Sequence, residues 1–214
     1  MFFPNVSGRI NLRLLAGVAG VPRTRVEECL DIVGLRDRGD DRFKGYSLGM
    51  KQRLGIAVGL LKSPALLVLD EPSNGLDPAG IREVRELIRR LGQDGRTTVL
   101  LSCDLLSEVQ QVCDDVTIIA RGRPVATGAV SAVLATGSTG DVRLRVPDPQ
   151  AAYDVLTTAG FTLTALPDAW RVHGVADPSA LTQALAAQSQ YLSELPPIAR
   201  DLESVFLDLT AQDQ

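Results

Sequence analysis

The stretch Ala65–Asp77, ALLVLDEPSNGLD, decides which fold this chain is expected to adopt. Its apolar run Leu66–Leu69 is too short for a helix and does not alternate with polar residues, which predicts a parallel strand buried on both faces. Asp70 and Glu71 end that strand. Because parallel sheets bind ligands at the carboxyl ends of their strands, one acid suits a hydrated metal ion and the other a reacting water.

The residues after the two acids predict a loop that enters a helix. Pro72 stops the strand, Asp77 stands at an N-cap position and Pro78 at the first helical position of an amphipathic helix that runs to Leu91. A capped surface turn without a function is the alternative interpretation of these residues. The sequence further upstream favours a functional site at Asp70 and Glu71.

Upstream of the strand, Tyr46–Ala57 has the sequence YSLGMKQRLGIA, a polar loop with a glycine that runs into an apolar helix ending near Lys62. Ser47 is expected to cap this helix. The free N–H groups and the dipole of a helix N-terminus favour anions. The segment is therefore a candidate anion site.

These motifs together resemble those of the ATPase subunits of ATP-binding cassette (ABC) transporters. YSLGMKQRLGIA is similar to the signature motif, LLVLDE to the Walker B strand and SNGLD to the D-loop, in the family's order and spacing. The resemblance covers about residues 1–130. It implies an α/β fold: a partial P-loop NTPase sheet, with a helical signature subdomain over residues 5–62 and the Walker B to switch region over 65–120.

The resemblance also implies roles for single residues. Glu71 would be the catalytic carboxylate that orients water, and Asp70 would hold Mg²⁺ through water. The residues implied in ATP binding are Ser47, Leu48, Gly49, Met50, Lys51 and Asp77. Leu48 and Met50 depart from the glycine and glutamine of the strictest signature. The implied partners are a transmembrane permease and a second ATPase subunit in a homodimer or heterodimer, at the inner face of the cell membrane.

Asp104 is the first departure from the family pattern. It comes after the predicted strand Thr97–Leu101, at the position of the switch histidine that senses the γ-phosphate in the family. An N-cap for the helix Leu105–Val112 is favoured over a catalytic role, because a carboxylate would repel that phosphate. The only histidine of the chain, His173, is expected to be a solvated strand residue.

The second departure is that G-x-x-x-x-G-K-[ST], the phosphate-binding P-loop pattern, occurs nowhere in the sequence. Phe2-Phe3-Pro4 resembles the segment directly after the family's Q-loop, so the chain is expected to begin just after that loop. Without a P-loop, binding of ATP by the chain alone should be lost. The absent strand should leave a gap between Thr97–Leu101 and Val116–Ala120, with marginal stability as the result.

Three functions remain open on this basis. The chain is a truncated ATPase of an exporter, or a non-catalytic subunit that completes a partner's ATP site in trans through Ser47 and Gly49, or a remnant without function. In the first case ATP hydrolysis would drive export.

Two further helices are expected before the signature segment. Ser7 should cap the first, while Pro22 and a capping box from Thr24 to Glu27 should start the second, which ends at Gly34.

The last third of the chain resembles the C-terminal extension of the drug- and antibiotic-exporter subclass. Residues 131–140 have the composition of a linker, with a helical turn at Ser131–Leu134, and residues 141–214 that of a small α+β domain of the ferredoxin-like type. Its predicted elements are, in order, the strand Val142–Val146, helix Pro149–Ala159, strands Phe161–Ala165 and Trp170–Val175, helix Pro178–Ala187, strand Gln190–Leu195 and helix Ala199–Leu209.

The composition of the chain limits the classes of protein and of partner that are expected. The chain has 214 residues, 45% of them hydrophobic and 22% charged, which is ordinary for a soluble globular protein. Lys and Arg outnumber Asp and Glu by 18 to 16 in residues 1–130, but are outnumbered by 10 to 4 in 131–214, so nucleic acid is not an expected partner. Three cysteines without C-x-x-C spacing indicate neither disulfides nor a zinc site. The chain is expected to be cytoplasmic.

Overall fold

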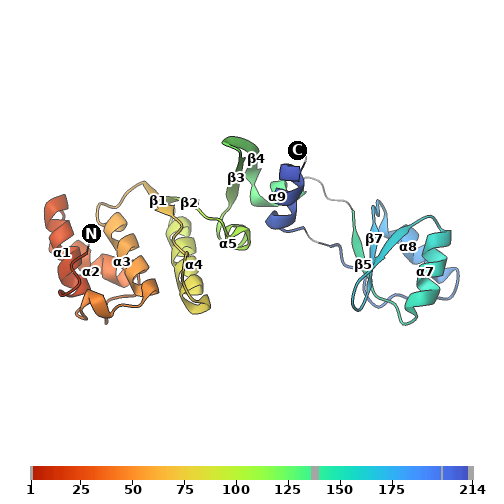
Figure 1. Cartoon of the computed structure of the whole chain (residues 1–214), viewed down its shortest axis with the longest axis horizontal. Coiled ribbons are helices and arrows are strands. Elements are labelled where there is room, and N and C mark those ends of the chain that lie inside the picture. Colours follow the sequence, from red (N-terminus) through yellow and green to blue (C-terminus); the bar gives the residue numbers. More distant parts are fainter. Residues whose placement is uncertain (1, 136–139, 199, 212–214) are drawn as a thin grey trace. The chain divides into compact units, whose positions relative to one another are not determined.

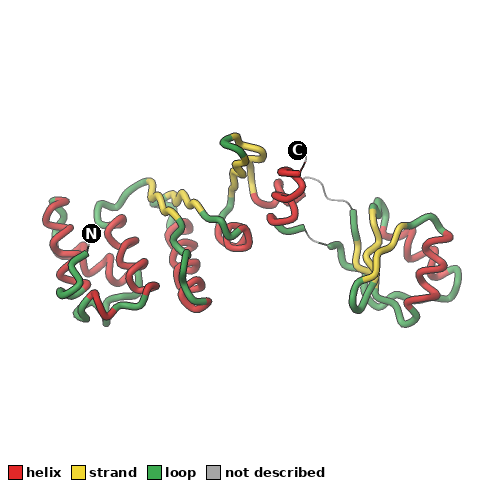
Figure 2. Tube along the Cα trace, viewed as in Figure 1, coloured by secondary structure: helices red, strands yellow, loops and turns green. Residues whose placement is uncertain are grey.

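The computed structural model describes residues 2–135, 140–198 and 200–211. The chain divides into two compact units, Met1–Cys113 and Asp114–Gln214, each with its own helices and strands (Figure 1). Figure 2 shows strands, in yellow, in both units. The pair in the first unit is parallel, whereas the strand pairs of the second are antiparallel. This is the mixed α/β architecture that the sequence predicts.

The first unit begins with three helices that share one core. They are α1 (Gly8–Ala19), α2 (Arg23–Ile32) and α3 (Leu48–Leu60), with a 3₁₀ turn at Phe43–Gly45 (Figure 1). One leucine from each helix is fully buried: Leu12, Leu30 and Leu54. The predicted caps of α1 and α3 are confirmed, because the Ser7 and Ser47 hydroxyls each accept the backbone N–H three residues on, at 3.2 Å.

The capping box predicted for α2 is wrong. The helix begins at Arg23, its N-cap position is Pro22, and no side chain caps it. Pro22 has the extended backbone of an N-cap residue, with φ −66° and ψ 151°, so the helix starts directly after it and before Thr24. Glu27, the expected acceptor, instead pairs with Arg9 and Arg13 of α1 and so ties the two helices together.

The signature region leads to the parallel pair β1 (Leu66–Asp70) and β2 (Thr98–Ser102), joined by α4 (Pro78–Gln93). Asp77 caps α4 as predicted, by accepting the Gly80 N–H at 3.0 Å. Leu67, which points into the core, is 6% exposed, and the apolar stripe of α4 is buried with it. One face of the pair is therefore covered.

The prediction that the strand after Ala65 is buried on both faces is wrong. Leu66, Val68 and Leu100 are 53%, 61% and 57% exposed, and we call the surface that these three side chains form the outer face. Because successive strand residues point to opposite sides, these three lie opposite the covered face. The sequence specifies a sandwiched strand, but only one covering layer lies within the described part of the chain.

The second unit begins with a hairpin that the sequence patterns do not predict. The strand predicted at Val116–Ala120 is β3 (Asp115–Ala120), and it pairs with β4 (Arg123–Ala129). Between β3 and β4, Arg121 and Gly122 both have positive φ, as a tight hairpin turn requires. The predicted helical turn is α6 (Val130–Ala135), which contacts α9 (Leu202–Ala211) through buried apolar side chains. Residues 136–139 of the predicted linker lie outside the described residues.

The remaining elements form a three-stranded sheet with two helices. The order is β5 (Val142–Leu144), α7 (Pro149–Thr158), β6 (Thr162–Ala165), β7 (Trp170–His173) and α8 (Pro178–Ala186), and β7 is the central strand. The predicted βαββα order is confirmed. The strand predicted at Gln190–Leu195 is wrong, since that segment makes only isolated bridges, such as Arg145 with Glu194. The start of the last predicted helix, Ala199, lies outside the described residues.

His173 lies in a strand as predicted, but it is not simply solvated. Its Nδ1 lies 3.1 Å from Oδ2 of Asp141, which is 7% exposed, and its Nε2 lies 2.8 Å from the Thr164 hydroxyl. Asp141 also accepts the Gly174 N–H at 3.1 Å. These hydrogen bonds connect β6 and β7 with the residue that precedes β5. The sequence around His173 does not show which residues are its partners.

Gly140 predicts a testable stability effect in the second unit. Its φ is +66°, a Cβ on it would lie 2.8 Å from the Val175 carbonyl oxygen, and its own carbonyl accepts the Val175 N–H at 2.9 Å. Gly140→Ala should lower the free energy of unfolding of this unit by about 2 kcal/mol or more. The fluorescence of Trp170, the only tryptophan, follows the unfolding of this unit in urea. Gly160→Ala, also at positive φ but with open space around it, should cost less.

Candidate functional site

The two acids predicted to be functional lie at the carboxyl end of β1. Asp70 is opposite Ser102 of β2 in the strand register, and its Oδ1 accepts a hydrogen bond from the Ser102 hydroxyl. The backbone N–H of Glu71 donates to the Ser102 carbonyl at 3.1 Å. Ser102 thus fixes both acids from the neighbouring strand.

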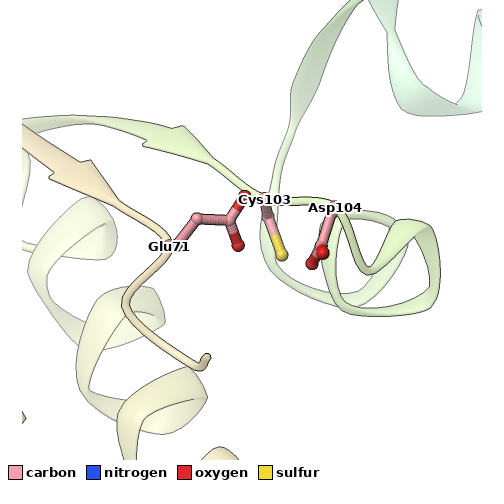
Figure 3. A group of neighbouring side chains, drawn as sticks. All are labelled: Glu71, Cys103 and Asp104. Atoms are coloured by element: carbon pink, nitrogen blue, oxygen red, sulfur yellow. The ribbon is translucent and has the colours of Figure 1, made fainter. Parts of the chain in front are cut away.

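Glu71 turns out of the strand direction in a left-handed backbone conformation. Its φ is +46°, which is uncommon for a residue with a side chain. Figure 3 shows its carboxylate directed toward Cys103 and Asp104, which come after β2. One ligand atom from each of these three residues lies within 4.8 Å of the others. The structure thus brings the predicted catalytic carboxylate and the residue at the switch position together.

Asp104 is not the helix cap that the sequence predicts. α5 spans Leu106–Val112, and its N-cap position is Leu105, whose side chain makes no capping hydrogen bond. An N-cap must directly precede the first helical residue, and Asp104 lies one position too early. Its exposed carboxylate is therefore available to the site beside Glu71.

An ion pair fixes α5 to α4. Arg85 donates from Nε to Glu108 Oε2 at 2.9 Å and from Nη2 to Glu108 Oε1 at 2.6 Å, and its Nη1 bonds Gln111 at 2.6 Å. Glu108 is only 9% exposed. Bidentate pairing of this type has a fixed geometry. Because the loop with Cys103 and Asp104 leads directly into α5, this pair also holds that loop.

Cys103 reports the electrostatics of the site. Burial raises the pKa of its thiol, and the carboxylates of Glu71, Asp104 and Glu108 raise it further. Each negative charge nearby disfavours the thiolate. The carboxyl end of the sheet is therefore a region of negative potential before any cation binds.

This electrostatic environment predicts the pH dependence of thiol modification. The thiolate is the reactive form. Alkylation of Cys103 by iodoacetamide should therefore reach half its maximal rate at a higher pH in the native chain than in the same chain unfolded in urea. Asp104→Asn should lower that midpoint, because it removes one of the negative charges that raise the pKa of the thiol. Mass spectrometry of the Cys103 peptide measures the rate, and an unchanged midpoint in Asp104→Asn would contradict the proximity of the two groups.

The signature residues form a second group, around the N-terminus of α3. Gly49 faces the α4 start closely, since a Cβ on it would lie 3.7 Å from Gly80 Cα. Leu48 is 51% exposed, and a Cβ on Gly75, which has φ +72°, would lie 3.4 Å from its side chain. The structure therefore places the predicted signature against the predicted D-loop.

Within this group, the side chains differ in their contacts and in their exposure to solvent. The Ser47 hydroxyl accepts the Met50 N–H but keeps its own proton to donate. The Lys51 ammonium lies 5.7 Å from the centre of the Phe43 ring, a cation–π distance. Met50 is 8% exposed and packs in the core, so its side chain is not at the surface. Ser47 and Leu48 are the exposed members.

The carboxylate oxygens at the end of β1 are suitable ligands for Mg²⁺, the ion that the resemblance implies. Asp70 offers an exposed carboxylate whose second oxygen makes no hydrogen bond within the described residues, and Glu71 adds another carboxylate nearby. Carboxylate oxygens and water are the ligands that Mg²⁺ prefers, whereas the Cys103 sulfur is too soft for it. Asp70 is thus the residue that would hold Mg²⁺, and Glu71 follows it directly.

Several residues that shape the site are not among those predicted from the sequence. They include Ser102 and the Arg85–Glu108 pair. The position of Ser102 directly after an apolar run is the one sequence signal that could have identified it.

Comparisons with known proteins agree with the motifs. The chain is 35% identical to the uncharacterised ABC transporter ATP-binding protein YhcH of Bacillus subtilis (strain 168), over 97% of this chain and 68% of the relative. It is 32% identical to the daunorubicin/doxorubicin resistance ATP-binding protein DrrA of Streptomyces peucetius, over 96% of this chain and 66% of the relative. It is 44% identical to the bacitracin transport ATP-binding protein BcrA of Enterococcus faecalis, over 58% of this chain and 41% of the relative.

A family model described as "AAA domain, putative AbiEii toxin, Type IV TA system" matches residues 21–102, which hold the signature segment and both parallel strands. The identity to YhcH extends over almost the whole of this chain. The chain therefore belongs to the family of ABC transporter ATP-binding proteins. It spans about two thirds of the length of YhcH and DrrA, and about two fifths of BcrA.

None of the helices in the described parts of the chain combines the length and the apolar character that crossing a bilayer needs.

Proposed function

We propose that the chain is an ATP-binding subunit of an ABC exporter. The observation that carries this proposal is the pairing of β1 and β2, which sets Asp70 and Glu71 beside Ser102 at the end of a parallel sheet. Relatives named for bacitracin transport and for daunorubicin/doxorubicin resistance support export as the process. The partner that this role requires is a transmembrane permease, to which the chain would bind at the inner face of the cell membrane.

In this role, a bound Mg²⁺ would supply positive charge beside the ATP phosphates. Asp70 would hold that ion, and the Ser102 hydroxyl orients the Asp70 carboxylate by donating a hydrogen bond to it. Glu71 accepts a hydrogen bond from the attacking water and aligns it. Asp104, next to Glu71, replaces the family's switch histidine with a negative charge, which slows the step.

We further propose that this chain does not hydrolyse ATP by itself. Its sequence contains no G-x-x-x-x-G-K-[ST] pattern, so the phosphates need backbone N–H groups and a lysine from elsewhere. Ser47, with its free hydroxyl proton, and Gly49, at the α3 N-terminus, are suited to close over ATP that a second subunit holds. The βαββα part of the second unit is an accessory, ferredoxin-like module in this proposal.

The test combines the full chain with purified YhcH and measures ATP hydrolysis. The chain alone should give no more phosphate than its Glu71→Gln variant. Added to YhcH, it should change the rate of YhcH at least twofold. Ser47→Asp keeps a capping oxygen but puts a charge before the phosphates, and should abolish this change; Ser107→Asp, on an exposed position of α5, should not. A rate that never responds to the chain would count against the trans role.

A further inference from the structure

Three side chains of the second unit are connected by hydrogen bonds, apart from the site at Asp70 and Glu71. The Thr164 hydroxyl of β6 lies 2.8 Å from Nε2 of His173 on β7, and Nδ1 of the same imidazole lies 3.1 Å from Oδ2 of Asp141. A hydroxyl, an imidazole and a carboxylate connected in this order are the groups of a nucleophile, a general base and the residue that orients the base. Such a set is recognised by its geometry, whichever fold carries it.

Asp141 is held in place, as an orienting carboxylate must be. Its side chain is 6% exposed, its Oδ1 accepts the Gly174 N–H at 3.1 Å, and Nε of Arg171 lies 3.1 Å from its Oδ2. Because Nδ1 faces a carboxylate, the neutral imidazole is assigned its proton on Nδ1, which leaves Nε2 as an acceptor. The Thr164 hydroxyl then donates to Nε2, and this is the direction in which a general base removes a proton.

The three-stranded sheet buries one side and exposes the Thr164 hydroxyl on the other. Leu144 and Val172 share a core with α7 and α8. Because successive strand residues point to opposite sides, Thr164, Arg171 and His173 lie on the side away from that core. Thr164 is exposed there, so a small molecule can reach its hydroxyl from solvent.

Arg171 indicates which acyl donor suits this hydroxyl. A guanidinium carries five N–H donors in a planar fork that matches phosphate, and the contact with Asp141 uses the one on Nε. Since Arg171 and Thr164 are directly opposite on neighbouring strands, a phosphate bound to the guanidinium lies beside the hydroxyl. α7 and α8 lie on the other side of the sheet, so they form no apolar pocket for a long acyl chain.

We propose that Thr164 is a nucleophile that accepts acyl groups, with small acyl phosphates as the class of donor. The Thr164 oxygen attacks the acyl carbon, Nε2 of His173 takes the hydroxyl proton, and the bond from that carbon to the phosphate oxygen breaks. Inorganic phosphate leaves with the electron pair of the broken bond, and Arg171 stabilises its negative charge. Water that gives its proton to the same imidazole then hydrolyses the threonine ester and releases the carboxylic acid.

This inference goes beyond the proposed function, since all its groups lie in the second unit and the reaction requires no ATP. Hydrogen bonds that only connect the strands are the alternative explanation of the same geometry. The two explanations differ in one measurable property, which is the reactivity of the Thr164 hydroxyl.

The experiment incubates the full chain with acetyl phosphate and locates acetyl groups by mass spectrometry of the fragmented peptides. Thr164 should be acetylated at least about tenfold faster than Thr162, because a positioned general base contributes about 10²–10⁴-fold. Thr162 is the matched internal control: it is exposed on the same side of the same strand and lies opposite His173 in the register, but the imidazole bonds Thr164. In the chain unfolded in urea, the two threonines should react at equal rates.

Two variants test the proton transfer itself. His173→Gln keeps a side chain that forms hydrogen bonds but cannot take the proton, and Asp141→Asn removes the carboxylate that keeps the proton on Nδ1. Each should lower the acetylation of Thr164 to the rate of Thr162. The fluorescence of Trp170 during unfolding in urea checks that the unit is still folded in both variants.

A further variant tests the class of donor. Arg171→Gln should slow the reaction of Thr164 with acetyl phosphate more than its reaction with 4-nitrophenyl acetate, because only the first donor has a phosphate for the guanidinium to bind. Equal losses with both donors would contradict acyl phosphates as the class.

Two results would overturn the nucleophile. One is equal acetylation of Thr164 and Thr162 in the folded chain, which needs no variant to fold. The other is a Thr164 rate that His173→Gln leaves unchanged while the unit is folded, which would show that the hydrogen bonds only connect the strands. Neither result depends on the rate measured in the YhcH mixture, so failure here leaves the proposed function standing.

Discussion

Arg85→Ala is expected to lower the free energy of unfolding of the first unit by about 3 kcal/mol. The substitution removes three hydrogen bonds and leaves the Glu108 carboxylate, 9% exposed, without its cation. An unpaired charge at such a site costs more than the pair itself contributes. The variant should also release α5 from α4, and with it the loop that carries Cys103 and Asp104.

The measurement is urea unfolding of the full chain followed by circular dichroism, with hydrogen exchange in α4 and α5. Trp170 fluorescence reports the second unit and should not change, which provides an internal reference. Arg82→Ala, at an exposed position of the same helix, should change the unfolding free energy by less than about 0.5 kcal/mol. If Arg85→Ala and Arg82→Ala had equal effects, the pair would not anchor α5.

A third variant separates the loss of the ion pair from the cost of leaving the Glu108 charge buried without a partner. Arg85→Met with Glu108→Leu replaces both partners by apolar side chains of similar length. It should recover a large part of the stability lost in Arg85→Ala, because no charge then remains buried. Hydrogen exchange near Cys103 should recover in parallel, since α5 is again packed.

Three predicted helix caps show which local interactions the sequence predicts correctly, whereas the capping box of α2 and the Asp104 cap of α5 are wrong. Ser7, Ser47 and Asp77 cap their helices as expected, because each side chain bonds an N–H only three residues away. The position of the two acids is also predictable, since an apolar run followed by Asp70 and Glu71 fixes where the strand ends. No tertiary information is needed for either inference.

Long-range interactions are not predictable in the same way. Arg85 and Glu108 are 23 residues apart, and nothing in either segment marks the other as its partner. Asp104 has a residue type suited to capping, but the helix start depends on how the loop leaves β2. The apolar run at Leu66–Leu69 indicates a strand that is suited to burial on both faces. How far each side chain is exposed depends on which other segments pack against the strand.

Asp104→His is expected to raise ATP hydrolysis about tenfold or more in a chimera that joins the unaligned part of YhcH to this chain. Asp104 lies with Cys103 and Glu71 in a cluster whose ligand atoms are within 4.8 Å of one another, so its charge opposes both Glu71 and an incoming phosphate. Histidine removes that charge and adds a group that can donate a hydrogen bond to the phosphate. Released phosphate measures the rate.

Asp104→Asn separates the loss of the carboxylate charge from the positive charge that a protonated imidazole adds. Asparagine removes the negative charge and keeps an amide N–H that can donate a hydrogen bond, so its gain leaves out only the contribution of a charged imidazole. The histidine variant should exceed it, and the excess should fall when the pH is raised enough to keep the imidazole neutral. Asp94→Asn, exposed in the turn after α4, should leave the rate unchanged. If neither substitution at 104 raised the rate, the carboxylate beside Glu71 would not be what limits turnover, and the negative potential that Cys103 senses would be relieved by the bound cation.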